Sequence, residues 1–290
     1  MRQGVHMRTQ TNTTHRMKQP LTNQQHKTNM EDLRQKYNPD GSLLRKAQLR
    51  MLDILVAVDE IFRRHHIDYW LHGGTLLGAV RHRGFIPWDD DMDIAVRTSD
   101  MPRIRKVLQQ ELPERFCYQD ITTDPHFYMA IAKVRDKHSL FDEFDSHKLK
   151  ERGMYIDIIP MEEIISAKNQ YPVNYFYRHC IWGRSRYNDR LLDRFLGCVC
   201  YYPAKLWIAG IRLWTKLFHT HTWGDIYGWA FTIEEKESDI FPVRDIEFEG
   251  HTLLGPANPD GFLRAIYGDY MQIPPEDKRA THTNRIEFYD

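Results

Sequence analysis

The chain of 290 residues is long enough for one large domain or two small ones. Its 40 basic and 40 acidic residues give a formal net charge of zero, which argues against the global basic field of a nucleic-acid-binding protein, so no nucleic-acid partner is expected. Its four cysteines (Cys117, Cys180, Cys198 and Cys200) form no Cys-x-x-Cys pair and are few for a disulfide scaffold, which indicates a reducing compartment.

Residues 1–30 are rich in Gln, Thr, Asn and His and have almost no apolar content. Such a segment cannot bury enough surface to offset the entropy lost on ordering, so we expect a disordered tail. No apolar stretch follows basic residues there, so no secretory signal peptide is predicted, and the expected location is cytoplasmic.

Residues 31–160 read as one compact α+β unit. Ser42 can cap a helix that runs to about His66, because apolar residues recur there at spacings of three and four. The elements predicted next are a strand at 67–72, a helix at 75–82, a strand at 92–96, a helix at 100–112 capped by Asp100 with Pro102 in its first turn, and strands at 127–135 and 154–159, the last ended by Pro160.

Residues 161–232 are rich in Tyr, Trp, Phe and Arg and are predicted to be a helical insert. Within it, residues 195–218 have the most apolar composition of the chain, yet they carry three basic residues and a proline, which makes a membrane-spanning helix a poor interpretation. Two alternatives stay open: helices buried on a core of their own, or peripheral contact with a membrane interface, where Trp207 and Trp214 would lie beside basic residues. Beyond Phe241 we expect short strands, then a helix opened by Asn258 and Pro259.

Four aspartates crowd one short segment: Asp89, Asp90, Asp91 and Asp93. Like charges this close repel one another, so the arrangement costs stability unless a cation compensates. Alternation along the strand would point Asp91 and Asp93 the same way, a bidentate seat for Mg²⁺, which prefers oxygen ligands. The alternative is a solvated turn.

Gly73 and Gly74 lie between a predicted strand and a predicted helix that starts at Thr75. Glycines there allow close approach of a ligand, and a helix N-terminus offers N–H groups to phosphate. This predicts a phosphate cradle facing the metal seat, with Arg81 near it. A tight turn alone would explain the same pair.

Asp157 interrupts an otherwise apolar strand, where a charge is costly unless it is paired or coordinates a metal. It is the candidate third carboxylate, and the alternative is a salt bridge to an arginine such as Arg135. Lys133 and Arg135, two apart on one strand, would reach the same face and could grip phosphate oxygens or form an exposed strand edge.

Three segments together carry a family resemblance: LHGGTLLGAVRHRGFIPWDDDMDIAV, MYIDIIP and IYGDYMQIPPEDKRATH. They resemble the LicD/fukutin phosphotransferases of the nucleotidyltransferase superfamily, over roughly residues 40–285. The resemblance implies a nucleotidyltransferase-like core, a small mixed sheet flanked by helices, formed by residues 31–160 and 233–290 around the insert at 161–232. By position, Asp91 and Asp93 would be the metal pair and Asp157 the third acid, and all three are the candidate catalytic residues. The candidate donor-binding residues are Gly73, Gly74, Thr75, Arg81, Lys133, Arg135, Arg279 and His282.

The activity that the resemblance implies is transfer of a phosphorylated alcohol, typically phosphocholine, from a CDP-linked donor such as CDP-choline to a hydroxyl of a polymeric or lipid-linked glycan. Mg²⁺, or alternatively Mn²⁺, would neutralise the phosphoryl charge, CMP would depart, and Asp157 could accept the hydroxyl proton. Two other functions stay open. One is nucleotidyl transfer with release of pyrophosphate, and the other is a catalytically silent scaffold or glycan-binding protein.

Overall fold

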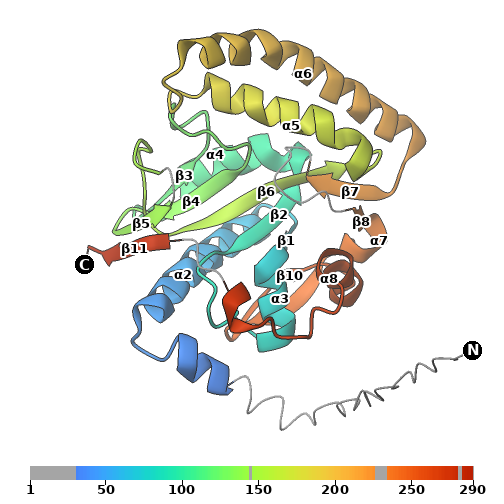
Figure 1. The fold of residues 1–290 in the computed structure, drawn as a ribbon. Helices are drawn as coiled ribbons and strands as arrows, with labels where there is room; N and C mark the ends of the chain where they lie inside the picture. Colours follow the sequence, from blue (N-terminus) through green and yellow to red (C-terminus); the bar gives the residue numbers. More distant parts are fainter. Residues whose placement is uncertain (1–30, 144–145, 226–233, 280–282, 290) are drawn as a thin grey trace, which may run out of the picture.

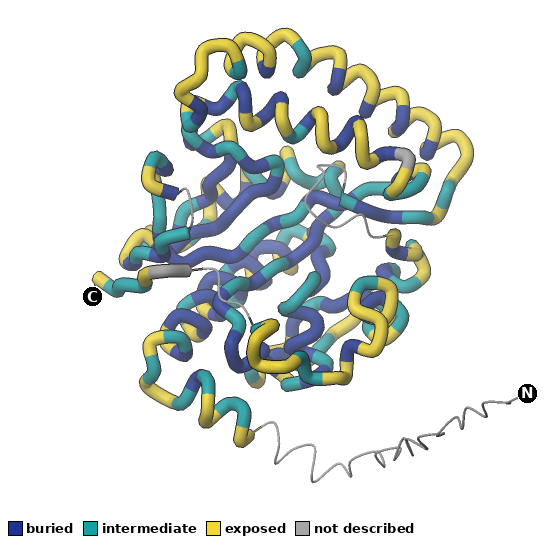
Figure 2. The backbone as a smooth tube through the Cα atoms, viewed as in Figure 1, coloured by how far each residue is buried: buried dark blue, intermediate teal, exposed yellow. Residues whose placement is uncertain are grey.

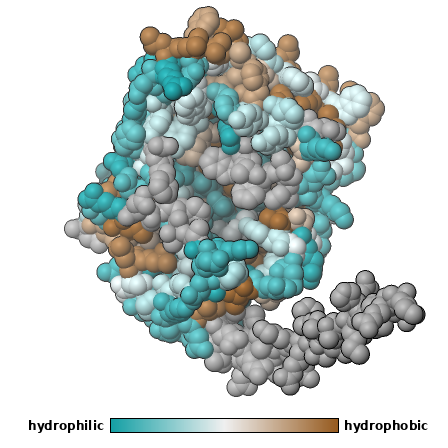
Figure 3. Space-filling model, in the orientation of Figure 1, coloured by the Kyte–Doolittle hydropathy of each residue, from teal (hydrophilic) through white to brown (hydrophobic). Residues whose placement is uncertain are grey.

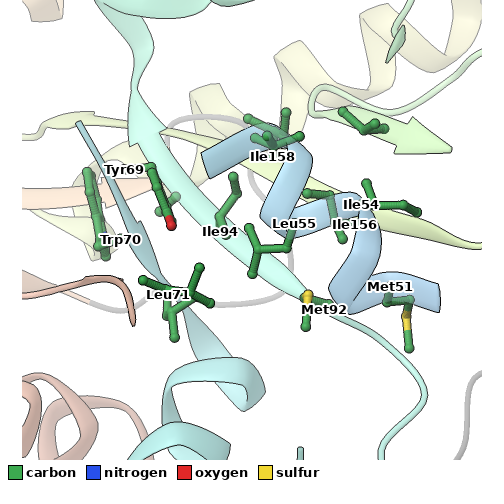
Figure 4. Close-up of a cluster of buried hydrophobic side chains, with 14 of the residues drawn as sticks. Met51, Ile54, Leu55, Tyr69, Trp70, Leu71, Met92, Ile94, Ile156 and Ile158 are labelled. Carbon is green, nitrogen blue, oxygen red and sulfur yellow. The ribbon is translucent and has the colours of Figure 1, made fainter. Parts of the chain in front are cut away.

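The first long helix lies against the central sheet in the computed structural model, which describes residues 31–143, 146–225, 234–279 and 283–289 (Figure 1). Helix α2 (Leu43–Arg64) begins as predicted, because the Ser42 side chain accepts a hydrogen bond from the Arg45 amide at 3.2 Å. Its apolar face packs on the sheet through Met51, Ile54 and Leu55, which are fully buried (Figure 4).

The sheet is mixed, which confirms an α+β fold with helices on a mixed sheet. Its strands run in the order β1-β2-β6-β4-β3, with β7 pairing β6 and β8 pairing β7. Only β2 and β6 are parallel; the other pairs in this sheet are antiparallel. The strands are β1 (Tyr69–Leu71), β2 (Asp93–Arg97), β3 (Phe116–Gln119), β4 (Ala132–Asp136), β6 (Tyr155–Glu163), β7 (Thr222–Asp225) and β8 (Glu235–Lys236).

Helices and hairpins surround this sheet. Residues 31–37 form a short helix ahead of α2, and the labelled helices that follow α2 are α3 (Gly73–His82), α4 (Met101–Glu111), α5 (Ala167–Arg184), α6 (Leu191–Phe218), α7 (Glu237–Ile240) and α8 (Pro259–Tyr267). Strands β9 (Arg244–Phe248) and β10 (His251–Gly255) form a hairpin, and β5 (Ser139–Glu143) pairs with β11 (Thr283–Phe288). As predicted, Asn258 opens α8: its side chain accepts from the Gly261 amide at 3.2 Å.

The strand predicted at 127–135 is only partly correct, since the strand begins at Ala132. Apolar residues alternate before Ala132 because Phe127, Met129 and Ile131 pack with Leu149 in a small separate apolar cluster. The alternation does not reflect pairing with another strand. Strands β3 and β5 were not predicted from the sequence.

Strand β6 runs through Pro160, where the sequence predicts a stop. The Asp157 amide donates to the Met92 carbonyl at 2.8 Å, so alternation points the position-160 amide away from β2. On that side Ile158 is the last residue paired with β4 and Met161 the first paired with β7. Pro160 therefore lies where a missing N–H breaks no bond between strands.

Asp100 does not cap α4 through its side chain, contrary to the prediction, although Pro102 does lie in the first turn. Residues Thr98–Asp100 already form a 3₁₀ turn that continues into the helix. Asp100 therefore has a helical backbone, whereas a capping residue has an extended one.

Two long helices, α5 and α6, make the outer layer at the top of Figure 1. They pack on each other through Cys180, Ile181, Ala204 and Ile208, all buried. The helices approach closely at Gly183 and Gly197: a Cβ at Gly197 would lie 2.9 Å from the Gly183 carbonyl carbon. Across the ranges that the structure describes, no helix has the length and apolar composition to cross a membrane.

We predict that Gly197→Ala destabilises the protein, even though alanine is the better helix former, because the added carbon meets rigid backbone. The control is Gly210→Ala in the same helix, where a Cβ meets nothing within 4 Å. That variant should gain up to about 1 kcal/mol from helix propensity alone. Urea unfolding of the two variants measures the contrast; equal gains would contradict the close approach.

Candidate functional site

The parallel pairing of β2 with β6 sets Asp93 directly beside Asp157. Ile94 and Ile158 face α2 (Figure 4). Alternation along the strands therefore sends the carboxylates of Asp93 and Asp157 to the opposite face of the sheet. The antiparallel pairing of β6 with β4 places Lys133 on the other side of Asp157. Three charged side chains from three adjacent strands thus form one row.

Lys133 supplies the cation for this row. Its Nζ lies 2.8 Å from Asp157 Oδ1 and 3.0 Å from Glu143 Oε1, and 3.3 Å from the ring centroid of Tyr155. Beyond this contact with Lys133, Asp157 Oδ1 has no hydrogen-bond partner among the described residues. The side chain of Lys133 is almost fully buried, which strengthens these charge interactions.

Burial raises the pKa of Asp157 to about 6, against the opposing pull of Lys133. Glu143 behaves differently. Burial works to raise its pKa, but Lys133 and Arg135 hold it at about 2. Of the two carboxyls that contact Lys133, Asp157 is therefore the one that can exchange a proton near neutral pH, while Glu143 stays ionised.

The glycine pair belongs to the first turn of α3 and lies against the acids. A Cβ on Gly73 would lie 3.3 Å from Asp93 Oδ2, and one on Gly74 would lie 2.9 Å from Asp89 Oδ2. Gly73 also has a φ of +53°, which side chains disfavour. The glycines thus make room for the carboxylates at a helix N-terminus, where the helix dipole favours negative charge.

Thr75 fixes the start of β2 relative to α3. Its Oγ1 accepts a hydrogen bond from the Asp93 amide at 2.8 Å. The backbone of the turn and the backbone of the acidic strand are therefore held together, independently of any ligand.

Asp91 precedes β2, which begins at Asp93, so the expected alternation of Asp91 and Asp93 along one strand does not hold. Strand alternation therefore does not orient Asp91. Its charge still reaches both neighbours: burial, followed by the charge of Asp91, raises the pKa of Asp93 and of Asp89 well above the usual range. A side-chain hydrogen bond between Asp89 and Asp91 raises the pKa of Asp89 further.

The other predicted donor-binding residues have protein partners. All three nitrogens of Arg135 are engaged, by Gln119 at 2.6 Å, by the Gly153 carbonyl at 2.9 Å and by Glu143 at 2.7 Å. The predicted alternative for Asp157, a salt bridge, is formed with Lys133 rather than Arg135.

Arg81 and Arg279 hold the C-terminal part of the chain. Arg81 donates to the Tyr270 carbonyl at 2.8 Å, and burial lowers its pKa to about 10. The Arg279 guanidinium lies 4.5 Å from the ring centroid of Trp88 and 5.1 Å from that of Tyr37. Donor contacts of both arginines stay predictions. His282 lies outside the described residues.

Tyr267, at the end of α8, is a site residue that the sequence did not single out. Its hydroxyl lies 3.8 Å from where a Cβ on Gly73 would be. Burial raises its pKa, and the charges of Asp93, Asp89 and Asp91 raise it further. Tyr267 belongs to the third segment of the family resemblance, IYGDYMQIPPEDKRATH, but that segment does not indicate that α8 packs against α3.

A cavity of about 660 Å³ is remote from these acids, since it is lined by Asp68, Arg97 and Phe241. Asp93 begins β2 and Arg97 ends it, so the cavity and the acids lie at opposite ends of the same strand.

The arrangement fits a divalent cation only in part. Within residues 31–143, 146–225, 234–279 and 283–289, no three His, Cys, Asp or Glu side chains converge as a ready-made metal site. What remains is an excess of buried carboxylates with raised pKa, together with Asp157, whose Oδ1 contacts the Lys133 ammonium at 2.8 Å. Mg²⁺ is commonly held by one or two carboxylates and completed by substrate phosphates and waters, and two acids meet that need.

Comparison with known proteins assigns this region to a family. Residues 66–195 match the model of the LicD/FKTN/FKRP nucleotidyltransferase domain. The chain carries a LicD-family domain. The matched stretch includes the acid cluster, the glycine turn, Lys133 and Asp157, and ends shortly after α6 begins.

Relatives of the LicD-family domain extend the match. The lipopolysaccharide cholinephosphotransferase LicD of Haemophilus influenzae is 28% identical over 258 residues, which cover 82% of this chain and 95% of that protein. An uncharacterised protein of Rickettsia prowazekii is 29% identical over 142 residues, 49% of this chain and 47% of its own length. Human ribitol 5-phosphate transferase FKRP is 51% identical over 35 residues, 12% of this chain and 7% of its own length.

We predict that Asp89→Asn stabilises the metal-free protein, because it removes a buried charge whose folded pKa is raised. A carboxyl whose pKa is higher in the folded state lowers the stability of the folded protein as the pH rises above its unfolded pKa of about 3.9. The gain in Tm, measured in EDTA, should therefore be larger at pH 8 than at pH 5.

The control is Asp260→Asn at an exposed carboxyl whose pKa is lowered by its hydrogen bond to Arg264. Its substitution should give no gain at either pH. A Tm for Asp89→Asn below that of the wild type at pH 8 would contradict the electrostatic cost of the cluster.

Proposed function

We propose that this protein is a phosphotransferase that moves a phosphorylated alcohol, phosphocholine or a similar group, from a CDP-linked donor to a glycan hydroxyl and releases CMP. The observation that carries the proposal is the row of Asp93, Asp157 and Lys133 beside the glycine turn. Supporting it is the likeness along 82% of the chain to a lipopolysaccharide cholinephosphotransferase, which also makes lipopolysaccharide or another lipid-linked or polymeric glycan the proposed acceptor.

Asp91 and Asp93 are the proposed ligands of Mg²⁺, or of Mn²⁺, with the donor diphosphate completing the coordination. The ion would supply charge neutralisation at the phosphoryl oxygens and the leaving group. Burial, followed by the charges of Asp91 and Asp157, raises the pKa of Asp93 although Lys133 lowers it, and a bound divalent ion would add positive charge that favours the ionised form.

Asp157 is the proposed third acid, as a ligand or as the proton acceptor. The acceptor oxygen would attack phosphorus in line, its proton would pass to Asp157, and the bond to CMP would break with the electron pair leaving on the CMP phosphate. A pKa of about 6 leaves Asp157 mostly ionised at neutral pH, yet more basic than an ordinary aspartate. Lys133 holds it in place from the next strand.

Nucleotidyl transfer is the second candidate, and it is favoured by the description of the matching family model. That reaction would need the same acids and glycine turn, but attack would fall on the nucleotide phosphorus and pyrophosphate would leave. Product analysis separates the two: CMP from CDP-choline supports phosphotransfer, and pyrophosphate from a nucleoside triphosphate supports nucleotidyl transfer. Neither product, together with no Mg²⁺-dependent nucleotide binding, would favour a silent scaffold.

We predict that Asp93→Asn lowers phosphotransfer by at least about a hundredfold, because loss of one charged oxygen weakens the hold on the ion where charge develops. Release of CMP from CDP-choline with a lipopolysaccharide acceptor measures it. Asp260→Asn, at the exposed pair with Arg264, is the matched control and should keep full activity. An active Asp93→Asn enzyme would refute the metal assignment.

We predict that Lys133→Met changes the pH profile of the reaction. Removing the cation that lowers the pKa of Asp157 should raise that pKa further, so the acidic limb of the kcat profile should move to higher pH. An acidic limb at unchanged pH would show that Asp157 is not the group whose ionisation that limb reports.

A further inference from the structure

Helix α6 leaves most of its apolar side chains uncovered. Twelve large hydrophobic residues of this helix are exposed, among them Leu206 at 75% and Trp207 at 62%. The helix forms the rim of the molecule, its outer side is exposed along its whole length (Figure 2), and hydrophobic surface gathers over it at the top of Figure 3. Apolar patches of this extent on soluble proteins mark interaction surfaces.

The helix has three distinct sides, which follow from its 3.6-residue period. The inner side carries Gly197, Ala204, Ile208, Ile211 and Thr215, at spacings of seven, four, three and four, and is buried against α5. The outer side carries the exposed apolar residues at the complementary positions: Leu192, Phe195, Val199, Leu206, Leu213 and Leu217. Burial of the inner side agrees with the first alternative from the sequence, helices that pack on a core of their own. The outer side contacts no other element within the described residues.

Between these sides runs a basic line. Arg194, Lys205, Arg212 and Lys216 are separated by eleven, seven and four residues, which places them on one flank of the helix. Arg212 is paired with Glu162 at 2.9 Å, and all four are exposed. On the other flank lie Trp207 and Trp214, seven residues apart, with exposed fractions of 62% and 51%.

The charge of this layer is unlike that of the whole chain. Residues 167–218 hold nine lysines and arginines against two aspartates, a net charge of +7, while the formal net charge of the chain is zero. Helix α6 itself carries four of these basic residues against one aspartate, so two copies of its outer side brought together would repel, which disfavours a symmetric dimer through it. An anionic surface would instead be attracted.

We propose that the outer side of α6 docks the protein on an anionic lipid bilayer. The helix would lie in the interface plane, with its leucines among the acyl chains, its tryptophans at the headgroup level and its basic flank on lipid phosphates. Its 28 residues would give a contact about 42 Å long. Four basic residues make a spanning orientation costly. The family match ends at residue 195, so this face lies almost wholly outside it and rests on residues that the proposed chemistry does not use.

The test is flotation of the full-length protein with phosphatidylcholine vesicles and with mixed phosphatidylcholine–phosphatidylglycerol vesicles. The wild type should bind the mixed vesicles much more tightly, and added salt should weaken that binding. Leu206→Glu/Leu213→Glu should lower the affinity at least about tenfold. Lys205→Glu/Lys216→Glu should remove the preference for the mixed vesicles. Leu43→Glu, at a leucine of α2 with 52% exposure, is the matched control and should bind as the wild type does.

Trp207→Phe/Trp214→Phe provides a second readout. Brominated lipids should quench the fluorescence of the wild type more than that of this variant, which keeps an apolar helix and does not depend on a charged substitution being tolerated. Phosphotransfer to a delipidated, soluble glycan should be unchanged in Leu206→Glu/Leu213→Glu, so loss of docking and loss of activity are separable. Failure of the wild type to float, equal binding by the glutamate variant, or a dimer in light scattering that Leu206→Glu/Leu213→Glu abolishes would each overturn the proposal.

Discussion

The structure depends on the in-register parallel pairing of β2 with β6, which forces two aspartates side by side. Asp93 and Asp157 cannot turn to the α2 face, because Ile94 and Ile158 fill it. Their repulsion is relieved on one side only, by Lys133 at 2.8 Å from Asp157. Burial and the neighbouring acids raise the pKa of Asp93 despite Lys133, so its ionised form would be favoured by a bound cation, as a cation site requires.

The first turn of α3 and Lys133 keep the carboxylates together despite the energetic cost of burying them. Gly73 and Gly74 lack the Cβ atoms that would crowd the carboxylates of Asp93 and Asp89, and Thr75 fixes the strand to the helix. The N-terminal dipole of α3 and the cation of Lys133 lower the cost without removing it. A metal-free protein that is less stable than its neutralised variants is the expected consequence of preorganising carboxylates for an ion.

Periodicity and composition were enough to predict α2, β1, the strands that carry Asp93 and Asp157, and helices within the segment 161–232, although not strand β7 at its described end. They were not enough for the site's geometry. The alternation at 127–131 came from a separate apolar cluster, and Pro160 is tolerated because its position falls between two partner strands. Tyr267 reaches the acids from the far end of the chain, a contact that no local pattern encodes.

The central claim is that Asp91 and Asp93 hold a divalent cation together with the donor's phosphates. Isothermal titration of Mg²⁺ into the protein, with and without CDP-choline, tests it most directly. The account predicts weak binding of Mg²⁺ alone, binding at least about tenfold tighter with CDP-choline present, and loss of that coupling in Asp93→Asn. Equal Mg²⁺ affinity with and without the nucleotide, or coupling retained in Asp93→Asn, would contradict it.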